Sequence, residues 1–218
     1  MILAAGRGER MRPLTDSLPK PLLEVNGQAL IVRQIEHLAR AGIGEIVINV
    51  AHLGHMIEHT LGDGQAYGVN IAYSREASAL ETAGGIAYAL DLLGNAPFLA
   101  VNSDIYCDFD YAGLIAKSPE LQAACLVLVD NPEHHPEGDF YLERNSIVTG
   151  GQTKLTFSGI GLYRPSLFAS IVRGQPAKLA PLLRSAIEAG KVEGIHHRGS
   201  WVDVGTPERL AELNNRES

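Results

Sequence analysis

Short apolar runs alternate with amphipathic segments through the first half of the chain. The runs at residues 2–5, 45–50 and 69–74 are predicted strands, because each is apolar and too short for a buried helix. Between them, residues 29–42 and 52–64 place apolar side chains at helical spacing, which predicts two helices. The order strand, helix, strand, helix, strand favours a parallel sheet joined by right-handed crossovers.

Local signals mark where the helices begin and end. Gly42 suits the left-handed residue that ends the first helix. A third helix is predicted to begin near Thr82, whose hydroxyl can cap it, and to run to Gly94. The strand that follows, at residues 97–101, is apolar throughout, as expected of a parallel strand covered on both faces.

The pattern changes after Asp104, where strands no longer alternate with helices. The remaining predicted elements are strands at 123–129, 155–163, 192–197 and 201–204, a hairpin over 138–151, a helix over 178–191 and a final helix from Pro207. We therefore expect a mixed sheet in a single α/β domain that spans residues 1–218. No hexapeptide repeat is present, so no C-terminal β-helix is expected.

Composition limits the partners of the chain. The formal net charge is −7, so most of the surface carries the wrong sign for nucleic acid. There is no apolar stretch near membrane-spanning length and no signal-peptide pattern, so a cytoplasmic protein without a membrane partner is expected. Cys107 and Cys125 are then expected to be buried thiols instead of a disulfide.

A glycine turn with nearby cations follows the first predicted strand. Gly6 and Gly8 would let the backbone approach phosphate oxygens closely, although a plain connection to a helix is an equally good interpretation of the glycines. Met11 stands where a dinucleotide-binding fingerprint has its third glycine, which argues against that fold. Arg10 and Lys20 bring enough positive charge to hold a triphosphate and a leaving pyrophosphate.

Two aspartates follow predicted strands in distant parts of the sequence. Asp104 ends an apolar run, and Asp203 lies in the segment WVDVGTPERL. Mg²⁺ prefers one or two carboxylates together with phosphate oxygens, so two aspartates that the fold brings together would be sufficient. Asp108 and Asp110 are alternative ligands, and strand-end aspartates are often turn formers or helix caps.

The segment LAAGRGERMRPLTDSLPKP resembles the signature of the sugar-1-phosphate nucleotidylyltransferases, L-A-A-G-x-G-x-R-x-x-P-x-T followed by P-K-P. The W-x-D-x-G-T-P element near the C-terminus is similar to that family as well. The resemblance implies a three-layer Rossmann-like nucleotidyltransferase fold with a mixed central sheet and a small sugar-binding β subregion. Residues 1–110 would mainly bind the nucleotide, and residues 111–218 would mainly bind the sugar.

The resemblance also implies roles for particular residues. Arg10 and Lys20 would bind and polarise the phosphates, and Asp104 and Asp203 would hold Mg²⁺. The implied nucleotide contacts are Ala4, Ala5, Gly6, Gly8, Thr82, Gly84 and Gly85. The candidate sugar contacts are Asp139, Ser158 and Lys178. On the residues alone, Gly84 and Gly85 fit tight helix packing, Asp139 and Ser158 fit ordinary turn chemistry, and Lys178 fits a solvated lysine.

The implied reaction joins a nucleoside triphosphate to a sugar 1-phosphate and releases pyrophosphate. The later segments are most similar to family members that use UTP and N-acetylmuramate 1-phosphate in cell-wall recycling. The alternative within the family is glucose or mannose 1-phosphate with UTP, dTTP or GTP. An alternative of another class is a catalytically silent sensor of nucleotide sugars. The sequence is compatible with a monomer or a small homo-oligomer.

Overall fold

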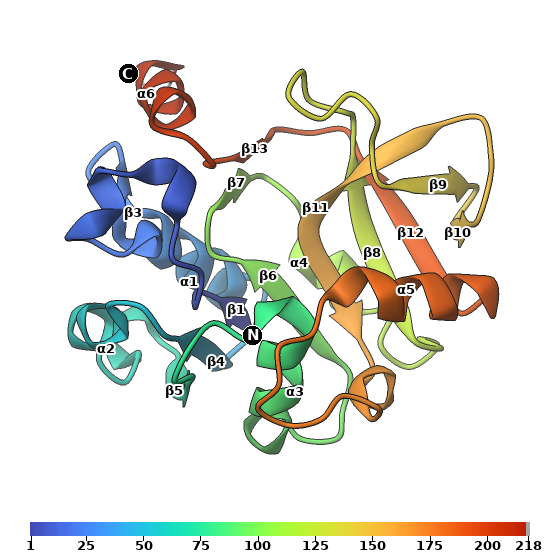
Figure 1. The fold of residues 1–218 in the computed structure, drawn as a ribbon, viewed down its shortest axis with the longest axis horizontal. Coiled ribbons are helices and arrows are strands. Elements are labelled where there is room, and N and C mark those ends of the chain that lie inside the picture. Colours follow the sequence, from blue (N-terminus) through green and yellow to red (C-terminus); the bar gives the residue numbers. More distant parts are fainter. Residues whose placement is uncertain (217–218) are drawn as a thin grey trace.

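A nine-stranded sheet forms the centre of the molecule, which we describe for residues 1–216 from a computed structural model (Figure 1). Its strand order is β5-β4-β1-β6-β11-β8-β12-β10-β9. The first half of the chain supplies four of these strands, β1 (Ile2–Leu3), β4 (Glu45–Val50), β5 (Asn70–Arg75) and β6 (Phe98–Asn102). They run parallel to one another, as the alternation of strands and helices predicts.

The second half of the chain makes the sheet mixed. Its strands are β8 (Ala124–Val129), β9 (Phe140–Glu143), β10 (Ser146–Val148), β11 (Lys154–Tyr163) and β12 (Val192–His197). The long strand β11 is antiparallel to both β6 and β8, whereas β12 is parallel to β8. The predicted mixed sheet is therefore confirmed.

Two small ribbons complete the β-structure. One pairs β2 (Glu24–Val25) with β3 (Gln28–Ala29), and the other pairs β7 (Ile105–Cys107) with β13 (Trp201–Asp203). The second ribbon joins the strand directly after β6 to a strand near the end of the chain. It brings together two segments that are far apart in the sequence.

Helices cover both faces of the sheet and create three layers. They are α1 (Leu30–Arg40), α2 (Gly54–Leu61), α3 (Glu81–Leu93), α4 (Tyr111–Ile115), α5 (Leu179–Glu188) and α6 (Pro207–Arg216). One apolar core joins α1, α2 and α4 to the sheet, and a second joins α3 and α5 to its other face. Figure 1 shows α6 apart from both layers, beside the segment that holds β3.

Most of the local signals hold, and one is wrong. Gly42 has a φ of 85° after α1, and α6 begins at Pro207, as predicted. The predicted cap by Thr82 is wrong, because α3 begins at Glu81 and its N-cap residue is Leu80. The buried Glu76 carboxylate accepts the Leu80 N–H at 2.9 Å and so takes over the task of a capping side chain.

Both cysteines are free, as the sequence predicts, but only Cys125 is buried, whereas Cys107 is half-buried. Within residues 1–216, no helix is long and apolar enough to cross a membrane.

Candidate active site

A cavity of about 560 Å³ opens at the carboxyl ends of β1 and β6, where open α/β sheets bind ligands. Most of the predicted nucleotide, phosphate and metal contacts line this cavity, which we call the nucleotide-side cavity. They are Ala4, Ala5, Gly6, Gly8, Arg10, Lys20, Thr82 and Asp104. The fold therefore brings the glycine loop, its cations and one predicted metal ligand into one cavity.

A second cavity, of about 350 Å³, adjoins the first. The two cavities share Leu3, Glu81, Thr82 and Asn102 in their walls. The predicted sugar contacts Asp139 and Lys178 line the second cavity together with aromatic side chains. The two cavities therefore lie side by side and form a two-part cleft; the first part holds Arg10 and Lys20, and the second has walls of mixed polarity.

The glycine loop keeps its shape through contacts around Gly8. Gly8 has a φ of 67°, and a Cβ there would lie 3.1 Å from side-chain atoms of both Lys20 and Thr15. The Thr15 hydroxyl donates to the Gly8 carbonyl at 2.8 Å. By contrast, a Cβ on Gly6 would meet nothing within 4 Å, which leaves room for a ligand beside that backbone.

A buried polar chain connects the loop to the start of α3. The Asn49 side chain accepts the Ala4 N–H at 2.9 Å and donates to the Glu76 carboxylate at 2.7 Å. Burial raises the pKa of Glu76, although its hydrogen bonds with Asn49 and Leu80 act in the opposite direction. Both side chains line the nucleotide-side cavity, and the sequence analysis missed them. The only sequence signal for Asn49 and Glu76 was that each is a polar residue near the end of a predicted strand.

Lys20 and Asp104 form an ion pair inside this cavity. Their side chains are only 11% and 25% exposed, so solvent screens the pair weakly. Lys20 belongs to a short 3₁₀ segment, Lys20–Leu22, and Asp104 lies in the turn between β6 and β7. The P-K-P segment and the strand-end aspartate therefore meet, a contact that the sequence analysis did not predict.

Asp203 reaches the same region through the β7–β13 ribbon. It pairs with Ile105, and the Val204 N–H donates to the Asp104 carbonyl at 2.8 Å. Its carboxylate binds the Arg209 guanidinium and lies 3.0 Å from Nε2 of His134. The cavity lining includes Gly205, two residues further on, but not Asp203 itself.

The two carboxylates fit a hard divalent cation. Asp104 directly precedes β7, and Asp203 lies on β13 opposite the next residue, Ile105. Each carboxylate attracts a basic side chain, so both occupy positions where positive charge is stabilised. No group of three or more His, Cys, Asp or Glu in residues 1–216 could hold a metal ion. A metal at Asp104 and Asp203 would therefore need further oxygen ligands, such as those of substrate phosphates.

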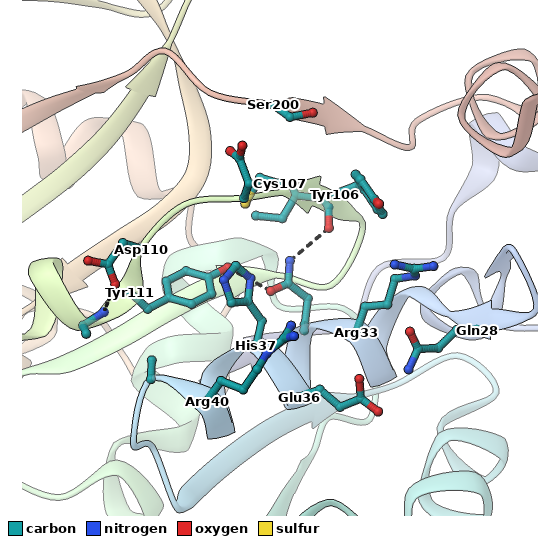
Figure 2. A pocket seen from close by; sticks show the side chains of 15 residues that line it. Gln28, Arg33, Glu36, His37, Arg40, Tyr106, Cys107, Asp110, Tyr111 and Ser200 are labelled. Atoms are coloured by element: carbon teal, nitrogen blue, oxygen red, sulfur yellow. Dashed lines mark hydrogen bonds between the residues drawn. The ribbon is translucent and has the colours of Figure 1, made fainter. Parts of the chain in front are cut away.

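The alternative aspartates are engaged elsewhere. Asp108 lies 2.9 Å from Nε2 of His197, and Asp110 accepts the Ala112 N–H at 3.0 Å as the cap of α4. Both line a separate cavity of about 720 Å³ on the other side of β7 (Figure 2). Asp110 is therefore a helix cap, which was the other sequence-based interpretation.

That separate cavity exposes a network that supports β7. The buried Gln34 side chain donates to the Ile105 carbonyl at 2.9 Å and accepts the Tyr111 hydroxyl at 2.8 Å, as the dashed lines in Figure 2 show. The His37 ring lies 4.7 Å from the Tyr111 ring, and burial, with Arg40 adding to it, lowers the pKa of His37. These contacts hold the strand that carries Asp104 at its start.

Three predicted ligand contacts serve packing in the structure. A Cβ on Gly84 would lie 2.5 Å from the Gln175 carbonyl oxygen, and a Cβ on Gly85 would lie 2.7 Å from the Glu76 carboxylate. The Gly84 N–H already donates to the Ala177 carbonyl at 3.1 Å. The Ser158 hydroxyl donates to the Val127 carbonyl at 2.7 Å inside the sheet, and the residue is 1% exposed. None of the three lines the cleft.

The other two sugar-side residues do face the cleft. Asp139 accepts the Phe157 N–H at 2.8 Å through one carboxylate oxygen, and the other oxygen lies 3.1 Å from Nε2 of His135. Lys178 is the N-cap residue of α5, and its side chain lines the second cavity. A fixed carboxylate and a cation therefore lie at the second cavity.

A family model for nucleotidyl transferases matches residues 1–145 of this sequence. The chain belongs to the nucleotidyl transferase family. The family resemblance inferred from the loop signature is thereby confirmed. In this nucleotidyl transferase, the matched region includes the glycine loop, the Lys20–Asp104 pair and the start of α3.

Two relatives match nearly the whole nucleotidyl transferase chain. It is 56% identical to the N-acetylmuramate alpha-1-phosphate uridylyltransferase of Neisseria meningitidis serogroup B, over 97% of this chain and 95% of that protein. It is 36% identical to the protein of the same name from Caulobacter vibrioides, over 97% of this chain and 96% of that protein. The similarity therefore extends through the sugar-side half as well.

The fold is shared with more distant proteins. The crystal structure of HddC from Yersinia pseudotuberculosis complexed with GMP-PN superimposes with a TM-score of 0.81 at 20% identity. The match covers 100% of this chain and 98% of that one. This likeness confirms the predicted Rossmann-like α/β fold.

Proposed function

We propose that this nucleotidyl transferase moves a uridylyl group from UTP to N-acetylmuramate 1-phosphate and releases pyrophosphate. The observation that carries the proposal is the two-part cleft, in which the glycine loop and its cations adjoin a cavity with Asp139 and Lys178. The name of the Neisseria relative, at 56% identity over almost the whole chain, supports the choice of substrates.

The reaction needs charge neutralisation more than covalent chemistry. A phosphate oxygen of the sugar 1-phosphate attacks the α-phosphorus of the nucleotide, and pyrophosphate leaves from the opposite side. Arg10 and Lys20 bind the phosphates and stabilise the negative charge that grows on the α-phosphate and the leaving group. The backbone around Gly6 holds the phosphates close to these cations. No side-chain nucleophile is required.

The proposed metal ligands are Asp104 and Asp203. A divalent cation held there, Mg²⁺ in our proposal, would neutralise phosphate charge and align the two reacting anions. Lys20 is bound to Asp104, so it is placed beside the proposed phosphate site. The ion pair therefore keeps the Lys20 ammonium in position for the substrate.

The sugar side offers groups that suit an acidic sugar. N-acetylmuramate differs from other hexosamines by a lactyl carboxylate, and Lys178 supplies a cation in the cavity where the sugar would lie. We propose that Lys178 binds that carboxylate or the sugar phosphate, and that Asp139 accepts sugar hydroxyl groups. Both substrates are small and polar, which agrees with our proposal of a cytoplasmic enzyme without nucleic acid or membrane partners.

The test is pyrophosphate release with Mg²⁺ from a grid of substrates. UTP, dTTP and GTP would each be combined with the 1-phosphates of N-acetylmuramate, N-acetylglucosamine, glucose and mannose. We expect the highest kcat/KM for UTP with N-acetylmuramate 1-phosphate, and a selective rise in KM for that sugar in Lys178→Ala. A higher kcat/KM for another pair would replace the proposed substrates. No release from any pair, by a folded protein that binds nucleotide, would favour a sensor.

A further inference from the structure

Arg209 of α6 is bound to Asp203. Its Nη1 donates to the Asp203 carboxylate and, at 3.1 Å, to the Asp203 carbonyl oxygen. The same nitrogen lies 2.9 Å from Nε2 of His134. The side chains of Arg209 and Asp203 are only 16% and 22% exposed, so this pair is shielded much better than a surface ion pair.

The backbone at Gly205 makes room for the guanidinium. A Cβ on Gly205 would lie 2.5 Å from Nη2 of Arg209 and 3.0 Å from the Asp203 carboxylate. Any other residue there would push the pair apart. Gly205 also lines the nucleotide-side cavity, whereas neither Arg209 nor Asp203 does.

Packing fixes the helix that carries Arg209. The buried Leu213 of α6 packs in a small core with Met11, Leu23 and Val25. At its start, the Leu210 N–H donates to the Thr206 carbonyl at 3.1 Å. The guanidinium is therefore held at Asp203 by a helix anchored to the glycine-loop segment.

Each proposed metal ligand thus has a basic side chain bound to it, but the two basic residues differ. Lys20 lines the cavity and can move its charge to a substrate phosphate. Arg209, like Asp203 itself, does not line the cavity, and its hydrogen bonds are directed at Asp203 and His134. These contacts act on Asp203.

We propose that Arg209 is a positioning residue that serves as counter-ion to Asp203 in the metal-free enzyme and competes with the divalent cation for its carboxylate. This inference rests on the proposed function, because it takes Asp203 as a metal ligand. Competition makes metal binding weak in the free enzyme. The metal then binds tightly only with the nucleotide, whose phosphate oxygens complete its ligands.

The test is a titration of the nucleotide-free protein with Mn²⁺, followed by electron paramagnetic resonance. Arg209→Met should bind Mn²⁺ about tenfold more tightly than the wild type, because the carboxylate loses its competing cation. Compared with the wild type, Arg209→Met should also have a lower Tm in the presence of a chelator, and Mn²⁺ should raise its Tm by more. Arg173→Met is the matched control, because Arg173 pairs with Asp91 on the surface, and it should change neither quantity.

Further variants separate the possible failures. Asp203→Asn should weaken Mn²⁺ binding with UTP present and abolish the gain in affinity from Arg209→Met. If Asp203→Asn weakens binding but Arg209→Met leaves the Mn²⁺ affinity unchanged, the counter-ion proposal is wrong and the metal site stands. If Asp203→Asn has no effect, the metal assignment itself is wrong. Should Arg209→Met fail to fold, Arg209→Lys, which loses the fork of donors, should show a smaller gain in affinity.

Discussion

The polar and charged side chains of the cleft come from single residues, and these residues were not equally predictable from the sequence. Arg10 and Lys20 were predicted because they belong to a long motif with fixed spacing, and Asp104 because the family carries an aspartate after its apolar strand. Asn49 and Glu76 were missed, because each is an isolated polar residue and only the assembled sheet brings them into one hydrogen-bonded chain. A buried pair of this kind leaves no periodic pattern in the sequence.

The Lys20–Asp104 pair gives the first prediction. Lys20→Ala and Asp104→Asn should each lower kcat/KM by more than about tenfold, which corresponds to ~1.4 kcal/mol of transition-state stabilisation. The matched control is Lys117→Ala, which breaks a more exposed pair with Glu193 and should leave kcat/KM unchanged. Steady-state kinetics on variants with native Tm would check this. Near-normal turnover by Asp104→Asn would contradict the metal assignment.

Glu76 gives a prediction about pH. Burial raises its pKa above the ordinary value of 4.5, so the folded state favours the protonated carboxyl. The resulting stabilisation is fully present below pH 4.5 and is lost as the pH rises through the raised pKa. Unfolding midpoints of the wild type and Glu76→Gln, measured from acid to neutral pH, should show the wild-type advantage shrinking as pH rises. A wild-type stability advantage that grows as the pH rises would contradict this prediction.

The helices and strands were predicted better than the residues at which they begin and end. The α3 helix follows from its apolar spacing, but the start of the helix is held by Glu76, which lies four residues before Leu80 and outside the helical pattern. Likewise, Gly84 and Gly85 fit both a ligand contact and close packing in the sequence. The structure places the Gln175 and Ala177 backbone against Gly84, a contact that the sequence does not encode locally.

Gly84→Ala distinguishes packing from ligand binding. The new Cβ would overlap the Gln175 carbonyl, so we expect a loss of about 1–3 kcal/mol in the free energy of unfolding despite the better helix propensity of alanine. Gly150→Ala is the control, because a Cβ there meets nothing within 4 Å. Denaturant unfolding checks the expectation. A variant with unchanged stability and weakened nucleotide binding would instead support the ligand contact.

At the scale of the whole molecule, the fold class was predictable from the sequence, but the pairing of β7 with β13 was not. Alternating strands and helices predicted the parallel half, and the hairpin predicted the mixed half. The β7–β13 ribbon was not predicted, because each strand has only three residues and their pairing spans distant parts of the chain. That ribbon places Asp203 opposite Ile105, the residue after Asp104, so the proposed metal site depends on the complete fold.

The most direct test of the proposed function is the identity of the product. The purified protein would be incubated with UTP, N-acetylmuramate 1-phosphate and Mg²⁺, and the reaction would be followed by ³¹P nuclear magnetic resonance. We predict that the diphosphate signals of a uridine diphosphate sugar and the signal of pyrophosphate will appear in equal amounts. Hydrolysis of UTP without a sugar diphosphate, or an unchanged spectrum, would contradict transfer between the two halves of the cleft.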